Sequence, residues 1–219
     1  LTIGFNQSTM HRDTSYYDLL ASEARLTSFV AIALGQLPQE SWFSLGRRLT
    51  AIGGEAALVS WSGSMFEYLM PSLVMPEYRG TLLERTCAAA VARQIAYGRQ
   101  RNVPWGISES GYNATDAQFN YQYRAFGVPG LGLKRGLGDD LVIAPYATLM
   151  ALPVDPPAAV RNLQRMAEAG FLGRHRNATA IVDRGSIVAI VPAASCSPRR
   201  SGPRCVPVSQ NSTSTVSPP

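Results

Sequence analysis

The chain has 219 residues, of which 46% are hydrophobic and 16% are charged, a composition that excludes disorder over most of its length. Its formal net charge of +5 would suit a nucleic-acid-binding protein. The excess lies at one end, however: residues 1–173 balance 14 basic with 14 acidic residues, whereas residues 174–219 carry six Arg and one Asp. We therefore expect no nucleic-acid partner for the neutral part.

In chain order, apolar residues at spacings of three, four and seven predict a helix over 18–34 and a shorter one over 38–49. A third helix follows the turn at Trp61–Gly63 and ends at Pro71. Further helices are predicted over 82–100, 144–151 and 155–169, and residues 181–191 are compatible with a strand.

Residues 102–141 lose this periodicity and are rich in Gly, Pro, aromatic residues and amides, so we expect a long loop region that carries the chemistry. Helices joined by such loops, without an alternation of strands and helices, predict an all-α fold of antiparallel helix pairs. No apolar run approaches the roughly 18 residues that a membrane-spanning helix needs. We expect a soluble fragment that does not itself insert into a bilayer. It begins with Leu1 and has no secretory signal pattern, which suggests a piece of a longer protein.

The end of the chain, residues 174–219, has six Pro, eight Ser and no aromatic residue, and so lacks material for a core. We expect two parts: a folded domain over 1–173 and a disordered basic tail over 174–219. The tail has two further interpretations. One is an arginine-rich arm for phosphates or acidic lipids. The other, which we favour, is translation of GC-rich DNA in a shifted reading frame.

Cysteine and histidine spacing indicates neither a disulfide nor a metal site, and we expect no cofactor. Cys87 lies in an apolar run, which predicts a buried, unreactive thiol. Cys196 and Cys205 lie in the basic tail, where nothing predicts a fold that would pair them. The two histidines belong to no metal-binding cluster.

Acidic residues beside aromatic residues suggest a carbohydrate site. Glu67 stands between Phe66 and Tyr68, and Glu109 follows Trp105 in a glycine-flanked turn. Sugar rings stack on aromatic faces, and cleavage or transfer of a glycosidic bond uses one carboxylic acid and one carboxylate. The acidic candidates are Asp18, Glu67, Glu109 and Asp116. Taken singly, each such residue is more often a helix cap or an ion-pair partner.

Four motifs are more specific than composition: Ser15–Arg25, Trp61–Pro71, Val103–Ser110 and Tyr121–Gly136. In this order they resemble the glucoamylase-like domain of bacterial cyclic β-1,2-glucan synthases, over roughly residues 4–173. The resemblance implies a partial (α/α) toroid of helical hairpins within a very large enzyme at the cytoplasmic face of the inner membrane. It implies a β-1,2-glucan substrate, anomer-retaining transfer that closes the glucan ring, and other modules of the parent synthase as partners.

By this resemblance, Glu109 is the candidate general acid/base and Glu67 the second catalytic carboxylate. Asp18, Glu23 and Arg25 are candidates for a hydrogen-bonded cluster at the floor of the cleft, or equally for helix support. The candidate sugar platforms are Trp61, Trp105, Tyr112, Tyr121 and Tyr123, and the candidate substrate-binding polar residues are Asn113, Asp116, Gln122, Lys134 and Arg135.

The chain departs from the family pattern after Gly173. An aromatic-Glu stretch and a later His-His-Gln-Gly segment are expected there, and Gly173–Thr179 has neither. The sequence therefore predicts a truncated fragment with little turnover. Two other functions stay open: a β-1,2-glucan hydrolase, which would release reducing ends without making rings, and a non-catalytic glucan-binding module.

Overall fold

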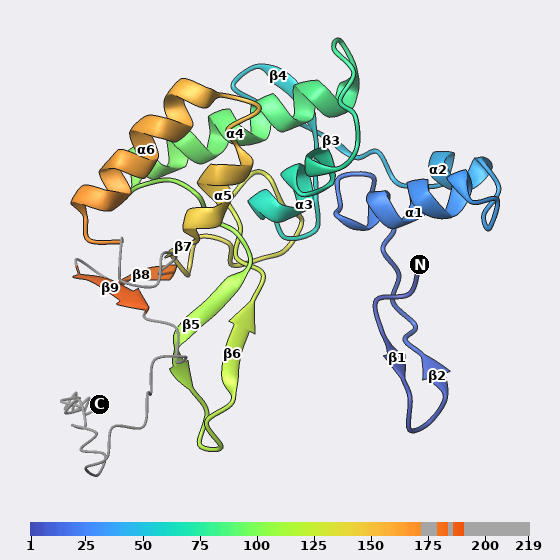
Figure 1. The fold of residues 1–219 in the computed structure, drawn as a ribbon, viewed down its shortest axis with the longest axis horizontal. Coiled ribbons are helices and arrows are strands. Elements are labelled where there is room, and N and C mark those ends of the chain that lie inside the picture. Colours follow the sequence, from blue (N-terminus) through green and yellow to red (C-terminus); the bar gives the residue numbers. More distant parts are fainter. Residues whose placement is uncertain (172–178, 184–185, 191–219) are drawn as a thin grey trace, which may run out of the picture.

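The computed structural model describes residues 1–171, 179–183 and 186–190 and combines helices with small antiparallel sheets (Figure 1). The helices are α1 (Ala24–Ala33), α2 (Glu40–Phe43), α3 (Met65–Leu69), α4 (Leu82–Gln100), α5 (Pro145–Met150) and α6 (Pro156–Glu168), with a 3-10 turn η1 (Pro71–Leu73). The strands are β1 (Phe5–Asn6), β2 (His11–Arg12), β3 (Leu49–Ile52), β4 (Glu55–Leu58), β5 (Ser110–Thr115), β6 (Tyr121–Arg124), β7 (Val142–Ile143), β8 (Thr179–Asp183) and β9 (Ser186–Ile190). They form the hairpins β1–β2, β3–β4 and β5–β6 and a sheet in the order β7-β8-β9.

The expected all-α toroid is wrong, because the described part of the chain is a mixed α/β structure. The helix predicted over 38–49 shrinks to α2, and β3 begins at Leu49. Gly53 and Gly54 turn the chain back with φ of 59° and 91°, the backbone form that a two-residue hairpin turn requires. The region expected to be a loop, 102–141, contains the β5–β6 hairpin.

Helices that begin at a capping side chain are confirmed. Ser64 Oγ accepts the Glu67 amide at 3.3 Å, and the Glu67 carboxylate accepts the Ser64 amide at 2.9 Å, so α3 begins with a capping box. Thr81 caps α4, which covers the predicted 82–100. Asp155 caps α6 by accepting the amide of Ala158 at 3.0 Å.

The helix predicted over 18–34 begins only at Ala24. The preceding segment is held in a non-helical bridge instead: the Leu20 amide donates to the Gly46 carbonyl at 2.9 Å, and the Gly46 amide donates to the Asp18 carbonyl at 2.7 Å. Leu19 and Leu20 are buried in this bridge. Because α1 packs against little besides α2, it leaves Phe29, Val30 and Leu34 exposed, whereas the apolar pattern predicted that they face the core.

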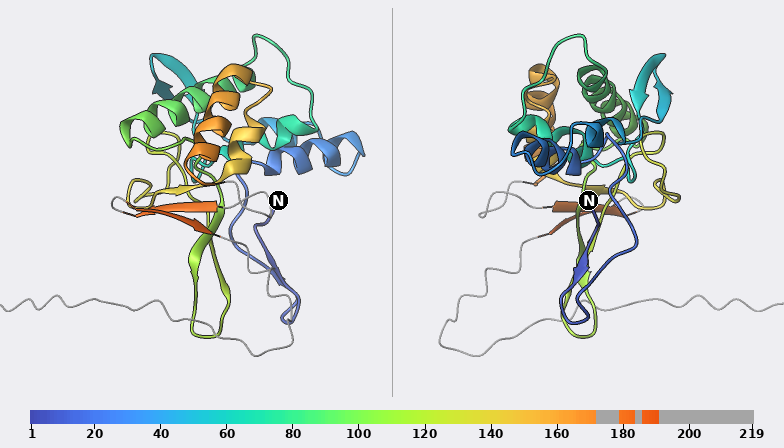
Figure 2. Two further views of the ribbon diagram at one scale, coloured as in Figure 1. Left: turned by 60° about the vertical axis from the view of Figure 1, so that its left-hand side comes forward. Right: turned by 90° about the vertical axis from the view of Figure 1, so that its right-hand side faces the viewer.

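The helices form one body, and two hairpins project from it in the same direction (Figures 1 and 2). One is β1–β2 at the N-terminus and the other is β5–β6. The three-stranded sheet lies beside the base of β5–β6. The hydrophobic core runs through the helical body, where α4 contacts β4 and α3, and α5 contacts α6. Its largest fully buried side chains include Tyr68, Leu58, Met65, Ile107 and Leu131.

A glycine-rich segment, residues 127–132, packs backbone against backbone on the loop that precedes α3. A Cβ added to Gly127 would lie 1.8 Å from the Ser62 carbonyl oxygen, and one added to Gly132 would lie 2.5 Å from the Ser62 carbonyl carbon. The Ser60 amide donates to the Leu131 carbonyl at 3.0 Å. These glycines are therefore required for close contact, because any side chain would push the two segments apart.

None of the helices in the described part of the chain has the length and apolar character needed to span a membrane. The strand expected over 181–191 is in fact a pair, β8 and β9, joined antiparallel. Apart from these two strands, the predicted basic tail, including Cys196 and Cys205, lies outside the described residues.

Candidate active site

A cleft of about 530 Å³ opens where the N-terminal segment, the segment before α1 and the loop before α3 meet. It brings together five of the residues that the sequence singled out: Asp18, Glu23, Trp61, Glu67 and Glu109. A hollow of about 610 Å³ lies between α4 and the β3–β4 hairpin, but alanines line much of it and Glu55 is its one acidic residue. The acidic cleft is therefore the candidate active site.

The backbone that carries Glu109 is fixed from three helices. In α4, the Gln94 side chain donates to the Ile107 carbonyl at 2.7 Å and accepts the Ile107 amide at 2.8 Å. The Ser108 hydroxyl accepts the Phe66 amide of α3 at 3.0 Å. The Tyr146 hydroxyl of α5 donates to the Glu109 carbonyl oxygen at 2.7 Å. A carboxylate on so well anchored a backbone is held in one place, as catalysis requires.

The Glu109 side chain is half-buried at the cleft, and its Oε2 accepts a hydrogen bond from the Tyr123 hydroxyl. Burial raises the pKa of Glu109, and the negative charge of Glu67 raises it further, while the bond from Tyr123 lowers it. A carboxyl with a raised pKa keeps its proton closer to neutral pH and can act as a general acid.

Glu67 has a different environment, because its carboxylate is saturated with donors. It is buried and accepts six hydrogen bonds, from the hydroxyls of Ser60, Ser62 and Ser64 and from the amides of Trp61, Ser62 and Ser64. The shortest, from Ser62 Oγ, is 2.5 Å. Two carboxylate oxygens offer about four lone-pair sites. Glu67 therefore organises the loop that presents Trp61, whose side chain is 64% exposed.

Glu23, at the start of α1, is the second carboxylate with a raised pKa. Burial is the largest cause, and the charges of Glu67 and Glu109 add to it. Its Oε2 accepts a hydrogen bond of 3.3 Å from the Ser22 hydroxyl. Glu23 and Glu109 thus line the same cleft as two half-buried carboxyls, and the charge of Glu109 contributes to the raised pKa of Glu23.

Arg25 does not line the cleft, and it binds carbonyl oxygens. Its guanidinium is buried and donates to the carbonyls of Ser22, Glu67 and Tyr68 at 3.0, 2.8 and 2.6 Å. The last two carbonyls belong to α3, where the end of a helix leaves such acceptors without partners. Among the alternatives for Arg25, these contacts favour support of a helix.

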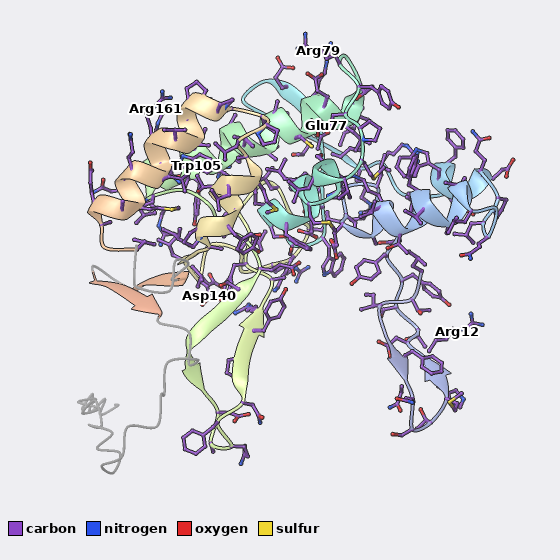
Figure 3. All side chains as sticks on the ribbon, in the orientation of Figure 1. Arg12, Glu77, Arg79, Trp105, Asp140 and Arg161 are labelled. Atoms are coloured by element: carbon purple, nitrogen blue, oxygen red, sulfur yellow. The ribbon has the colours of Figure 1, made fainter. Side chains whose placement is uncertain are left out.

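The other predicted site residues are spread over the molecule. Trp105 is buried inside the helical body (Figure 3), where Asn162 bonds both its amide and its carbonyl, at 3.1 and 2.8 Å. Asp116 is in the turn of the β5–β6 hairpin, and its hydrogen bonds with Asn120 lower its pKa.

Four more of these residues lie on β6 or directly after the glycine-rich segment. Gln122 donates to the Asn120 carbonyl at 3.2 Å, Lys134 donates to the Ala125 carbonyl at 3.2 Å, Tyr123 bonds Glu109, and Arg135 is exposed. The side chains of Tyr112, Asn113 and Tyr121 lie outside the described part of the structure.

Residues 15–190 match the Glycoamylase family model, which describes a glucoamylase family. The chain belongs to this family. Over 175 residues it is also 55% identical to the cyclic beta-(1,2)-glucan synthase NdvB of Rhizobium meliloti (strain 1021), a match that covers 80% of the chain and 6% of that relative. The chain thus spans a small part of the relative's length. The resemblance read from the four motifs is confirmed, and the family match continues past residue 173 to residue 190.

The cleft of this glucoamylase-like domain also contains residues that the sequence did not single out. Tyr16, Tyr17 and Ser62 line the cleft. Burial raises the pKa of Tyr17, and the charges of Glu23, Glu109 and Glu67 raise it further. The signal was present in the motif Ser15–Arg25, where two tyrosines precede Asp18, but the prediction covered only the charged residues of this motif.

Proposed function

We propose that this chain supplies the site with which a cyclic β-1,2-glucan synthase transfers β-1,2-linked glucan chains, and that it retains turnover, contrary to the expectation drawn from its departure from the family pattern after Gly173. The cleft with two half-buried carboxyls, Glu23 and Glu109, beside the exposed Trp61 is the observation that carries the proposal. The relative is a synthase of cyclic β-1,2-glucan by name. In the intact parent, other modules would supply the linear glucan, and the site would face the cytoplasm at the inner membrane.

In the proposed reaction Glu109 is the general acid/base and Glu23 the nucleophile. Glu109 gives its proton to the departing glycosidic oxygen as the bond from that oxygen to C1 breaks, and a Glu23 oxygen bonds C1. The Glu109 carboxylate then takes the proton of an acceptor hydroxyl, whose oxygen bonds C1 and releases Glu23. When the acceptor is the far end of the same glucan, the product is a ring.

Glu23 replaces Glu67 as the second catalytic carboxyl in this proposal. The six donors on Glu67 stabilise its charge and occupy its oxygens, which leaves no free lone pair to attack a sugar carbon. Glu23 accepts only the Ser22 hydroxyl, at 3.3 Å, and its own backbone amide among the described residues, and burial still raises its pKa. Its oxygens are therefore more available for reaction.

The experiment incubates the 219-residue chain with linear β-1,2-glucan labelled at its reducing end. Transfer gives labelled products both longer and shorter than the substrate, together with unlabelled rings. Hydrolysis gives shorter labelled products and new reducing ends. Glu109→Gln and Glu23→Gln should each abolish transfer while leaving glucan binding in place. Binding without turnover in the wild type would leave the chain a glucan-binding module, and absence of binding would refute the proposal.

A further inference from the structure

The hydroxyl of Tyr123 is the one donor from a side chain that the described residues direct at the Glu109 carboxyl. Tyr123 lies on β6, and Glu109 immediately precedes β5. The hydrogen bond therefore joins the two strands at the base of the β5–β6 hairpin, beside the cleft that Glu109 lines. The ring of Tyr123 is 58% exposed. Because Tyr123 contributes little to the core, the main interaction of its side chain is the hydrogen bond from its hydroxyl to Glu109.

We propose that Tyr123 is a positioning residue that holds the Glu109 carboxyl by Oε2 and leaves Oε1 to exchange the proton with the glycosidic oxygen. This inference rests on the proposed function of Glu109. It differs from the role expected from the sequence, in which Tyr123 was a platform for a sugar ring.

The chemistry follows from the donor count of the two groups. A tyrosine hydroxyl has one proton, and while it donates to Oε2 a protonated Glu109 carries its own proton on Oε1. Loss of that proton leaves a carboxylate that the same donor stabilises. One hydrogen bond therefore serves both halves of the reaction, because it orients the acid in the first step and supports the base in the second.

Several ionisable groups face this pair and set the background for its titration. They are Glu67 from the loop-capping end of α3, Glu23 from the start of α1, Tyr17 from the N-terminal segment and Tyr146 from α5. The Tyr123 hydroxyl donates to the Glu109 carboxyl, and the Tyr146 hydroxyl donates to the Glu109 carbonyl, so Tyr123→Phe is expected to leave these groups in place and to isolate the effect of the Tyr123 hydroxyl on Glu109.

The first test is a carbon NMR titration of glutamate carboxyls, with Glu109 assigned by the signal that Glu109→Gln removes. Tyr123→Phe should raise the pKa of Glu109 by about one pH unit, because the donor that favours the charged form is gone. Tyr78→Phe removes the hydroxyl of an exposed tyrosine on the segment before α4, and should leave the Glu109 titration unchanged. A Glu109 pKa that stays or falls in Tyr123→Phe would overturn the proposal.

A reciprocal measurement uses Glu109→Gln and needs Tyr123→Phe only to assign the signal. Burial and the bond to Glu109 raise the pKa of Tyr123, and the charge of Glu109 raises it further. In Glu109→Gln that charge is absent, so one tyrosine should titrate at lower pH in an ultraviolet titration. Tyr123 is identified as the tyrosine whose transition is absent when Tyr123→Phe is combined with Glu109→Gln. No downward shift in Glu109→Gln would refute the contact.

The pH profile of transfer connects this contact to catalysis. In Tyr123→Phe the alkaline limb of the pH profile of kcat should move to higher pH, together with the pKa of Glu109. The value of kcat should fall by a larger factor than that by which KM changes. A limb that stays in place while the Glu109 pKa moves would show that Tyr123 does not act through the acid/base. A chain unable to process glucan would overturn the proposed function. The two titrations need no turnover, so they would still decide whether Tyr123 acts on Glu109.

Discussion

The side chain of Gln94 bonds both backbone groups of Ile107, donating to the carbonyl oxygen at 2.7 Å and accepting the amide at 2.8 Å. The pairing copies what a neighbouring β-strand would provide, but it comes from the middle of a helix. It holds a buried extended segment whose backbone groups need partners. Glu109 follows two residues later, so the position of the proposed acid/base depends on a glutamine in the core.

Gln94→Met should therefore destabilise the fold by about 1–3 kcal/mol, because it leaves the buried Ile107 amide without a partner, while the Ile107 carbonyl keeps only the Met65 amide as a donor, at 3.1 Å. Urea unfolding measures this change. Gln100→Met, at the exposed end of the same helix, is the matched control and should cost less than about 0.5 kcal/mol. Equal unfolding midpoints for the two variants would contradict the role assigned to Gln94.

Glu67→Gln should cost about 2–4 kcal/mol of folding stability. The amide group of the new glutamine would face donors from Ser60 to Ser64 that now bind a carboxylate oxygen. Glu84 occupies the same third helical position in α4 but accepts the Gly80 amide at an exposed site. Glu84→Gln should cost about 1 kcal/mol or less. Thermal unfolding of both variants compares them, and a Glu67→Gln variant of full stability without activity would indicate a catalytic Glu67 instead.

Trp61→Ala should weaken binding of linear β-1,2-glucan about tenfold, or about 1.4 kcal/mol, with little change in stability. The indole is 64% exposed at the cleft, so its removal leaves no cavity in the core. Titration calorimetry on the Glu109→Gln background measures the affinity without turnover. Phe43→Ala, at an equally exposed aromatic residue on α2, should leave the affinity unchanged. Wild-type affinity in Trp61→Ala would exclude the indole from the binding site.

The two carboxyls with raised pKa predict how stability changes with pH. Above the ordinary glutamate value of 4.5, the unfolded chain releases protons that folded Glu23 and Glu109 still hold, so folding stability falls as pH rises through their raised pKa values. Glu23→Gln and Glu109→Gln should remove part of this loss, and each variant should be more stable than the wild type at neutral pH and closer to it at acid pH. Urea unfolding across this pH range tests the sign. Glu40→Gln, on the exposed start of α2, should follow the wild type.

The sequence predicted the elements that local chemistry defines. Residues 82–100 carry a Thr cap and a regular apolar face, and α4 has these bounds. The helix predicted over 38–49 was wrong. The Gly53–Gly54 turn pairs Leu49–Ile52 with a partner strand, and the spacing of apolar residues along a helix carries no information about such a pairing. The all-α expectation came from reading glycine-rich segments as loops when they are hairpin turns and close contacts.

The candidate site divides in the same way. Acidic residues beside aromatic residues led to Glu109, Glu67 and Trp61, and all three line the cleft. The separate roles of Glu67 and Glu23 could not be read from the chain, since they depend on six donors that converge on one carboxylate and on burial at the other. Sequence identifies which groups can ionise, and only their surroundings determine what the ionisation does.

The glycines that let residues 127–132 touch the Ser62 backbone also restrict how this scaffold can diversify. Where two main chains meet directly, there is no side chain to enlarge, shrink or recharge, so the height of the tryptophan above the cleft cannot be tuned there by point substitution. Changes in the shape of the cleft are therefore expected to come from surfaces that project freely, such as the two hairpin arms.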